Sequence, residues 1–184
     1  KTNLTTRGTG SNMGAADVLE VFNIYGQAST GSSEQSRILI QFPTTKISTD
    51  RTNSVIPASG SVDFYLRLYN AKHSTTLPKN FTLVVQPLSQ SWEEGNGIDM
   101  DEYKDETYQG EGANWIFAAS GTNWTREGGD YVGTTDLAHN TAGDNDAYIS
   151  RVYRQTFSDG TEDMIIDISE LVENWIDGNI SNYG

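Results

Sequence analysis

The chain has 184 residues, no cysteine, and 25 acidic against 12 basic side chains, which gives a formal net charge of −13. This balance disfavours nucleic-acid binding, which depends on Lys and Arg at phosphates. The lack of cysteine excludes disulfides and thiolate metal sites, and no apolar stretch is long enough for membrane insertion as a spanning helix. At this length we expect one domain over residues 1–184, a module of a longer polypeptide.

Alternation of apolar and polar residues is the main signal along the chain. After an irregular, Gly- and Ser-rich beginning, the predicted strands cover residues 18–25, 37–42, 63–70, 81–88, 148–157 and 164–168. Short strands of period 2 in a turn-rich sequence are typical of an antiparallel β-sandwich. The side chains expected to be nearly fully buried are Ile38, Ile40, Phe42, Phe64, Leu66, Leu68, Leu83, Val85, Leu171 and Trp175.

Residues 93–145 form a long insert between two of these strands. Such a length is unusual for a structureless connection in a compact domain, so we expect an ordered loop insert. Its candidate glycan-binding side chains are Tyr103, Tyr108, Trp115 and Trp124. Their flat rings could stack on sugars, but large aromatics also order long loops by packing back on a sheet. Packing is the favoured interpretation for each tryptophan.

An acidic run within the insert is the main candidate metal site, and residues 143–146 (Gly-Asp-Asn-Asp) are a weaker one that turn chemistry explains better. Asp99, Asp101 and Asp105 offer oxygen ligands close together, as Ca²⁺ requires. The run lacks the glycine and the distal glutamate of an EF-hand loop, so a solvated acidic loop is the stronger alternative. No other cofactor is expected. The sequence contains no nucleophile motif and no histidine cluster, and we expect no catalytic activity.

One short helix is predicted near the C-terminal end, over residues 169–178. Ser169 is a favourable N-cap residue, and Gly178 suits the position that follows a helix. The apolar side chains that share one face at helical spacing are Leu171, Val172, Trp175 and Ile176. In a sandwich such a helix covers one open end of the core, and Trp175 is expected to anchor it.

Several motifs together resemble a known family. They are residues 37–42 (Arg-Ile-Leu-Ile-Gln-Phe), 66–69 (Leu-Arg-Leu-Tyr), 91–95 (Ser-Trp-Glu-Glu-Gly), 167–175 and 182–184 (Asn-Tyr-Gly). In this order they resemble the DNRLRE-type jelly-roll domains of bacterial and archaeal surface and secreted proteins. Residues 97–103, with Asn-Trp at 114–115 and Asn-Trp-Thr at 123–125, resemble a form found in virion proteins of marine bacteriophages.

The resemblance implies a jelly roll that acts as a non-catalytic structural or adhesion module, in a virion or at an extracellular or cell surface. Its implied partners are other structural chains of the same assembly, together with surface polysaccharide. The alternative is a carbohydrate-binding module of a secreted or cell-surface bacterial protein. A distant third alternative is a glycan hydrolase that uses the acids of the insert.

Members of that family have a strand before the position of Lys1 and another after Gly184. We therefore expect exposed sheet edges, which invite pairing with other chains. A neighbouring chain could supply the strand, by strand addition next to residues 37–42 or 164–168.

Overall fold

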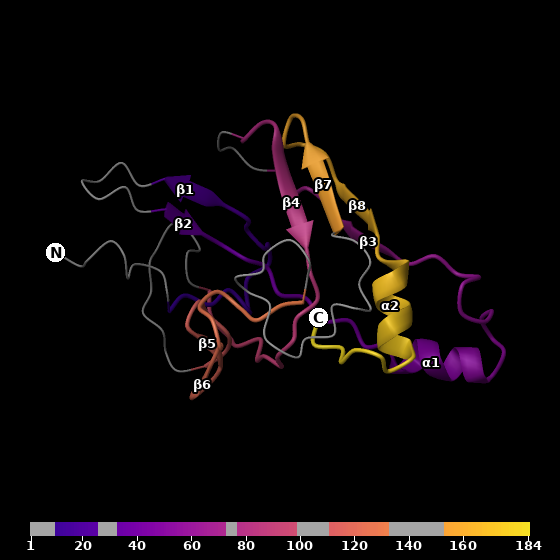
Figure 1. The fold of residues 1–184 in the computed structure, drawn as a ribbon. Helices are drawn as coiled ribbons and strands as arrows, with labels where there is room; N and C mark the ends of the chain where they lie inside the picture. Colours follow the sequence, from indigo (N-terminus) through magenta and orange to yellow (C-terminus); the bar gives the residue numbers. More distant parts are fainter. Residues whose placement is uncertain (1–9, 26–32, 73–76, 99–110, 133–152) are drawn as a thin grey trace. The chain divides into compact units, whose positions relative to one another are not determined.

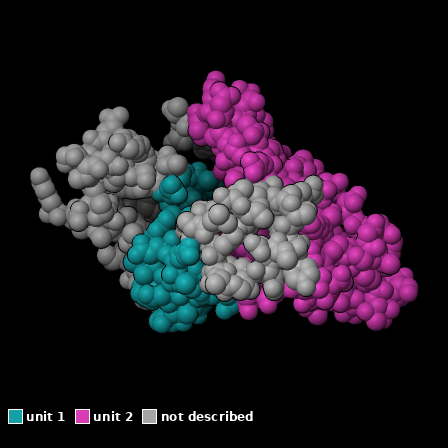
Figure 2. All heavy atoms as spheres, viewed as in Figure 1, with its two compact units in different colours: residues 1–40, 90–130 teal, residues 41–89, 131–184 magenta. Residues whose placement is uncertain are grey.

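The computed structural model describes residues 10–25, 33–72, 77–98, 111–132 and 153–184 (Figure 1). These residues form small antiparallel sheets and short helices, so the chain is β-rich. They fall into two compact units, each built from two separate segments (Figure 2). Unit 1 comprises Lys1–Ile40 and Gln90–Asp130, and unit 2 comprises Gln41–Ser89 and Tyr131–Gly184.

Unit 2 contains most of the predicted strands. Strand β3 (Tyr65–Leu68) pairs antiparallel with β8 (Met164–Asp167), and β4 (Phe81–Val85) pairs antiparallel with β7 (Tyr153–Phe157). Within the described residues, these observations confirm the strands predicted over 63–70, 81–88, 148–157 and 164–168.

Cross-strand side-chain pairs stabilise the β4–β7 sheet. Phe81 lies opposite Phe157, and their rings stack with centroids 4.9 Å apart. On the other face, the hydroxyls of Thr82 and Thr156 are 2.9 Å apart and share a hydrogen bond. Both kinds of pair are known to stabilise antiparallel sheets.

The core of unit 2 gathers the inward side chains of these strands and of helix α2 (Ser169–Ile176). Leu66, Leu171 and Trp175 are 8%, 2% and 9% exposed, as predicted. Phe64, Leu68, Leu83 and Val85 pack against this core but are half-buried, so the prediction of nearly full burial is wrong for these four. The core also contains buried side chains that were not on the predicted list, namely Val132, Tyr153, Phe157, Met164, Ile166, Ile168, Val172 and Ile180.

The edge of β8 that faces away from β3 is occupied by a side chain of β7. The amide group of Gln155 donates to the C=O of Asp163 at 2.9 Å and accepts from the N–H of Ile165 at 2.8 Å. The carboxamide thus takes the place of a neighbouring strand. It leaves little room for strand addition next to residues 164–168 at this edge.

Helix α2 ends as its sequence predicts. Gly178 has φ of +72°, a conformation that glycine adopts without steric cost. The N–H of Asn179 donates to the C=O of Asn174 at 3.0 Å, and the N–H of Gly178 donates to that of Trp175 at 3.4 Å. These two bonds define a Schellman motif, which satisfies carbonyls at the end of the helix.

The start of α2 differs from the prediction. Ser169 is the first helical residue and not the N-cap, a position taken by Ile168 without a side-chain cap. The carboxylate of Asp167 accepts from both the N–H and the hydroxyl of Ser169, at 2.9 and 2.6 Å. The Ser169 hydroxyl oxygen in turn accepts from the N–H of Phe64 at 2.8 Å, so the serine ties the helix to the start of β3.

Helix α1 (Thr45–Thr52) was not predicted, because it has no apolar stripe and none of its side chains is buried. Lys46 and Asp50 form an exposed ion pair one helical turn apart, at 2.6 Å. Arg51 forms a bidentate pair with Glu173 of α2, at 2.6 and 2.8 Å. Since helices with little apolar surface depend on such contacts, the Arg51–Glu173 pair attaches α1 to the rest of unit 2.

One further prediction for the N-terminal third is wrong, and another holds only in part. Residues 37–42 alternate in sequence but form no strand, and Phe42 is 49% exposed where burial was expected. Ile38 and Ile40 are half-buried. Of residues 18–25, only β1 (Asn23–Tyr25) is a strand, and it pairs with β2 (Ser33–Gln35). Alternation predicts a strand only when a neighbouring strand is in place to pair with it.

The turn between β7 and β8 is organised by one carboxylate. Glu162 accepts hydrogen bonds from the N–H groups of Asp159, Ser158 and Thr161, at 3.0, 2.8 and 3.1 Å. The bond from Asp159 is the largest of the contributions that lower the pKa of Glu162 to about 2, from an ordinary value of 4.5. The charged form is therefore the one that stabilises the turn.

This depressed pKa predicts an acid-sensitive turn. Because the folded-state pKa lies below the unfolded one, the contribution of Glu162 is present above pH 4.5 and is lost as pH falls toward about 2. A Glu162→Gln variant should lose less stability than the wild type between pH 5 and pH 2.5, both approximate limits of this window. Urea unfolding midpoints at both pH values measure the difference, and parallel pH profiles would contradict the assignment.

Candidate functional site

The predicted metal ligands Asp99, Asp101 and Asp105 lie outside the described residues, as do Tyr103 and Tyr108. Trp115 and Trp124 are both described and belong to unit 1. They flank the hairpin of β5 (Phe117–Ala119) and β6 (Thr122–Asn123), which forms within the predicted insert.

Trp124 packs inside unit 1. It is 5% exposed and lies in a cluster with Ala113 and Ala118, against which Leu39 and Trp92 also pack. Its indole N–H donates to the C=O of Asn114 at 2.8 Å. The structure therefore places Trp124 in a core and offers no open face of its ring to a sugar.

Trp115 is half-buried and its ring is contacted by two groups of unit 1. The guanidinium of Arg37 lies 4.9 Å from the ring centroid, a cation–π distance. Arg37 also donates to the C=O of Gly128 at 2.5 Å, and a side chain at Gly128 would meet the ring at 2.9 Å. Arg37 therefore connects the tryptophan to the loop that follows it and holds the ring in a fixed orientation.

The Ser-Trp-Glu-Glu-Gly motif is organised around Asn12, which is buried at 8% exposure. The Asn12 amide donates to the carbonyls of Glu94 and Ala113, at 2.8 and 2.7 Å. Its oxygen accepts from the N–H groups of Gly14 and Gly97, at 3.0 and 2.9 Å. One side chain thus joins three separate segments of unit 1. Sequence reasoning missed it, because Asn12 lies in a stretch predicted to be irregular.

Glycines make this arrangement sterically feasible. A Cβ on Gly97 would lie 2.2 Å from the carbonyl oxygen of Asn12, and one on Gly14 would lie 2.3 Å from that of Glu94. Neither backbone oxygen can move away without breaking the hydrogen bonds around Asn12. Gly95 and Gly97, directly after the Trp-Glu-Glu motif, are the sequence signal that could have indicated close backbone packing.

An acidic surface depression of about 610 Å³ lies beside this cluster. Its lining includes Glu93, Glu94, Glu111 and Asn96. Two of the carboxylates have partners within the protein: Glu93 accepts from the N–H of Ser120 at 3.1 Å, and Glu111 accepts from the Asn96 amide at 3.2 Å. Among the described residues, no three acids or histidines are grouped in a way that could hold a metal ion.

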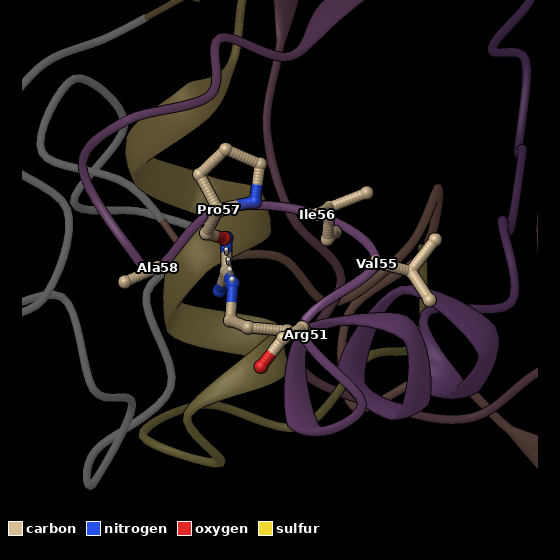
Figure 3. A pocket seen from close by; sticks show the side chains of 6 residues that line it. Arg51, Val55, Ile56, Pro57 and Ala58 are labelled. Atoms are coloured by element: carbon tan, nitrogen blue, oxygen red, sulfur yellow. Dashed lines mark hydrogen bonds between the residues drawn. The ribbon is translucent and has the colours of Figure 1, made fainter.

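A second depression, of about 410 Å³, lies in unit 2 between Arg51 and residues 54–58 (Figure 3). Arg51 is the charged residue of this depression, and each of its three guanidinium nitrogens donates a hydrogen bond within the protein. Its Nε donates to the C=O of Pro57 at 3.2 Å, and its two terminal nitrogens bind Glu173. This bond raises the pKa of Arg51 and lowers that of Glu173. The arginine therefore has a structural role here.

The outer surface of the β3–β8 sheet carries large exposed side chains. Tyr65, Tyr69 and Ile165 are 55%, 74% and 49% exposed. Arg67 is also exposed, lies between Tyr65 and Tyr69, which is the first residue after β3, and is opposite Ile165 in the ladder. This group of four residues, which we call the tyrosine–arginine surface, was predicted as strand but not as a site.

Comparisons with known proteins identify no relative: no family model, curated protein or solved structure matches the chain. In the part of the chain that the structure describes, no helix has the length and apolar character needed to cross a membrane.

Proposed function

We propose that the chain is a non-catalytic structural or adhesion module of a larger surface assembly, in a virion or at an extracellular surface. In this proposal its sheets belong to a jelly-roll sandwich, and its partners are other structural chains of the assembly. The observation that carries it is the tyrosine–arginine surface. Its large exposed side chains gather on and beside one strand pair, and tyrosine and arginine are enriched in protein interfaces.

The pattern of polar contacts also supports a binding role over catalysis. Two acids of the first depression, Glu93 and Glu111, accept hydrogen bonds from the protein's own groups. A hydrolase would instead need a pair of carboxylates held free toward a substrate. The resemblance of the sequence motifs to surface and virion modules points in the same direction.

The alternative, a carbohydrate-binding module, is favoured by Trp115. Among the four aromatic candidates it is the described residue that is half-buried, and Arg37 lies over its ring. Fixed aromatic rings are well suited to stacking on sugars. If this alternative holds, Trp115→Ala should abolish glycan binding and Trp115→Phe should retain part of it.

Two measurements on the full chain separate these functions. Quantitative mass spectrometry of fractionated source material should find the chain in stoichiometric amounts with structural proteins of particles or surface layers, and a glycan array should show no binding. Saturable array binding that Trp115→Ala removes would establish the alternative. Release of reducing sugar from any array glycan would contradict both.

A further inference from the structure

Strand β3 is hydrogen-bonded to β8 through one edge. The N–H of Ile168 donates to the C=O of Phe64 at 2.9 Å, and because bonded pairs alternate along an antiparallel ladder, the backbone of Leu66 also faces β8. The N–H and C=O groups of Tyr65 and Arg67 consequently point to the opposite edge. Among the described residues no backbone group pairs with them there.

The side chains along this edge alternate strictly between inside and outside. Asp63, Tyr65, Arg67 and Tyr69 are exposed, and the residues between them are half-buried or buried. Neither Asp63 nor Arg67 has a salt bridge within the part of the chain that the structure describes. Along the exposed face, an acid (Asp63), a tyrosine (Tyr65) and a base (Arg67) therefore follow one another at every second residue.

We propose that this edge of β3 pairs antiparallel with the same edge of a second copy of the chain, in a register centred on Tyr65. The order acid–tyrosine–base is self-complementary when one copy is reversed: Asp63 lies opposite Arg67 of the second copy, and Tyr65 lies opposite its counterpart. Tyr65 and Arg67 direct their backbone groups toward the partner, so the two Tyr65 residues exchange both hydrogen bonds, and the pairing extends β3 by two residues to Asp63. The inference rests on the proposed function, whose partner it names.

Charge selects this register among those that the hydrogen-bond pattern allows. A register centred on Arg67 would place two arginines directly opposite each other, which is destabilising. One centred on Leu66 would place Asp63 and Arg67 opposite tyrosines and would leave both charges unpaired. The other sheet edge near the surface, that of β8, is filled by Gln155 and does not compete.

Disulfide trapping tests the register directly, because the chain contains no cysteine. Bonded pairs in antiparallel sheets have Cα atoms about 5.5 Å apart, within the range for a disulfide. Under mild oxidation, Tyr65→Cys should form a covalent dimer. The matched control Arg67→Cys should not, because four residues of offset separate the two sulfurs by about 14 Å along the strands. Equal trapping of both variants, or of neither, would overturn the proposal.

A charge-exchange series tests the ion pairs. Arg67→Asp places two acids opposite each other and Asp63→Arg places two bases opposite each other, so each single variant should lose dimer in sedimentation at about 0.15 M salt. The double variant D63R/R67D restores opposite charges and should recover the wild-type dimer fraction. Failure of this recovery, or a monomeric wild type up to about 1 mM, where even weak interfaces associate, would contradict the pairing.

These results are independent of the assays for the proposed function. All substituted side chains are exposed, so unfolding midpoints should stay at the wild-type value and a lost dimer cannot be ascribed to misfolding. A trapped Tyr65→Cys dimer together with glycan hydrolysis would refute the function and keep the interface. An absence of the Tyr65→Cys dimer, together with an absence of glycan hydrolysis, would refute the interface alone.

Discussion

Replacing Leu171 with alanine is expected to lower the free energy of unfolding of unit 2 by about 2–5 kcal/mol, the range for a leucine removed from a packed core. Leu171 is 2% exposed and lies at the centre of the cluster formed by α2 and the strands. The loss has two parts, the transfer free energy of the side chain and the cavity that remains. Urea denaturation followed by circular dichroism measures it.

Two further variants make the result specific. Val84→Ala removes an aliphatic side chain from β4 that is 50% exposed, and it should change stability by less than about 0.5 kcal/mol. Leu171→Met keeps the volume and should cost less than about 1.5 kcal/mol. A Leu171→Ala midpoint equal to that of Val84→Ala would mean that α2 does not cover this core in solution.

The sequence predicted those parts of the fold that depend on local pattern and burial together. In β3, polar and apolar side chains alternate between Tyr65 and Leu68, which predicts a sheet with one buried face. The observed burial follows the same alternation. Helix α2 carries its apolar face and its terminating Gly178 within ten residues, so its existence and its end could both be read locally.

The same reasoning failed where contacts with residues distant in the sequence determine the secondary structure. Residues 37–42 have the alternation of a strand, yet no strand forms there, and Phe42 is half-exposed. Helix α1 lacks an apolar stripe and is held through Arg51 by a glutamate that lies 122 residues away in the sequence. Local patterns contain no information on such a partner.

The candidate sites likewise divide into features that follow from local sequence pattern and features that depend on distant contacts. The exposure of the tyrosine–arginine surface follows from strand alternation once the inward face is known, and its charges are visible in the sequence. The role of Asn12 could not be predicted, because the carbonyls to which its amide donates, those of Glu94 and Ala113, lie 82 and 101 residues away. Among the aromatic residues, Trp115 and Trp124 look alike in sequence, and only tertiary packing makes one half-buried and the other buried.

That dependence on distant partners makes Asn12→Ala a strongly disruptive change in unit 1. The substitution leaves the carbonyls of Glu94 and Ala113 and the N–H groups of Gly14 and Gly97 without their Asn12 partner. A buried polar group that loses its partner costs about 1–3 kcal/mol, and water entering the vacated space recovers part of this. We expect a total loss of about 2–5 kcal/mol.

Tryptophan fluorescence suits the measurement, because three of the four tryptophans, at positions 92, 115 and 124, belong to unit 1. Asn96→Ala is the matched control: Asn96 is exposed, and among the described residues its amide bonds to Glu111, so the loss should stay within about 0.5 kcal/mol. Asn12→Asp separates the two halves of the network, since it keeps the acceptor for the glycine N–H groups but turns a carboxylate oxygen toward two carbonyls. It should therefore destabilise unit 1 strongly at neutral pH and less at low pH, where the carboxyl is protonated and can donate. If Asn12→Ala unfolded at the same denaturant concentration as Asn96→Ala, the buried asparagine would not be what joins the Trp-Glu-Glu motif to the rest of unit 1.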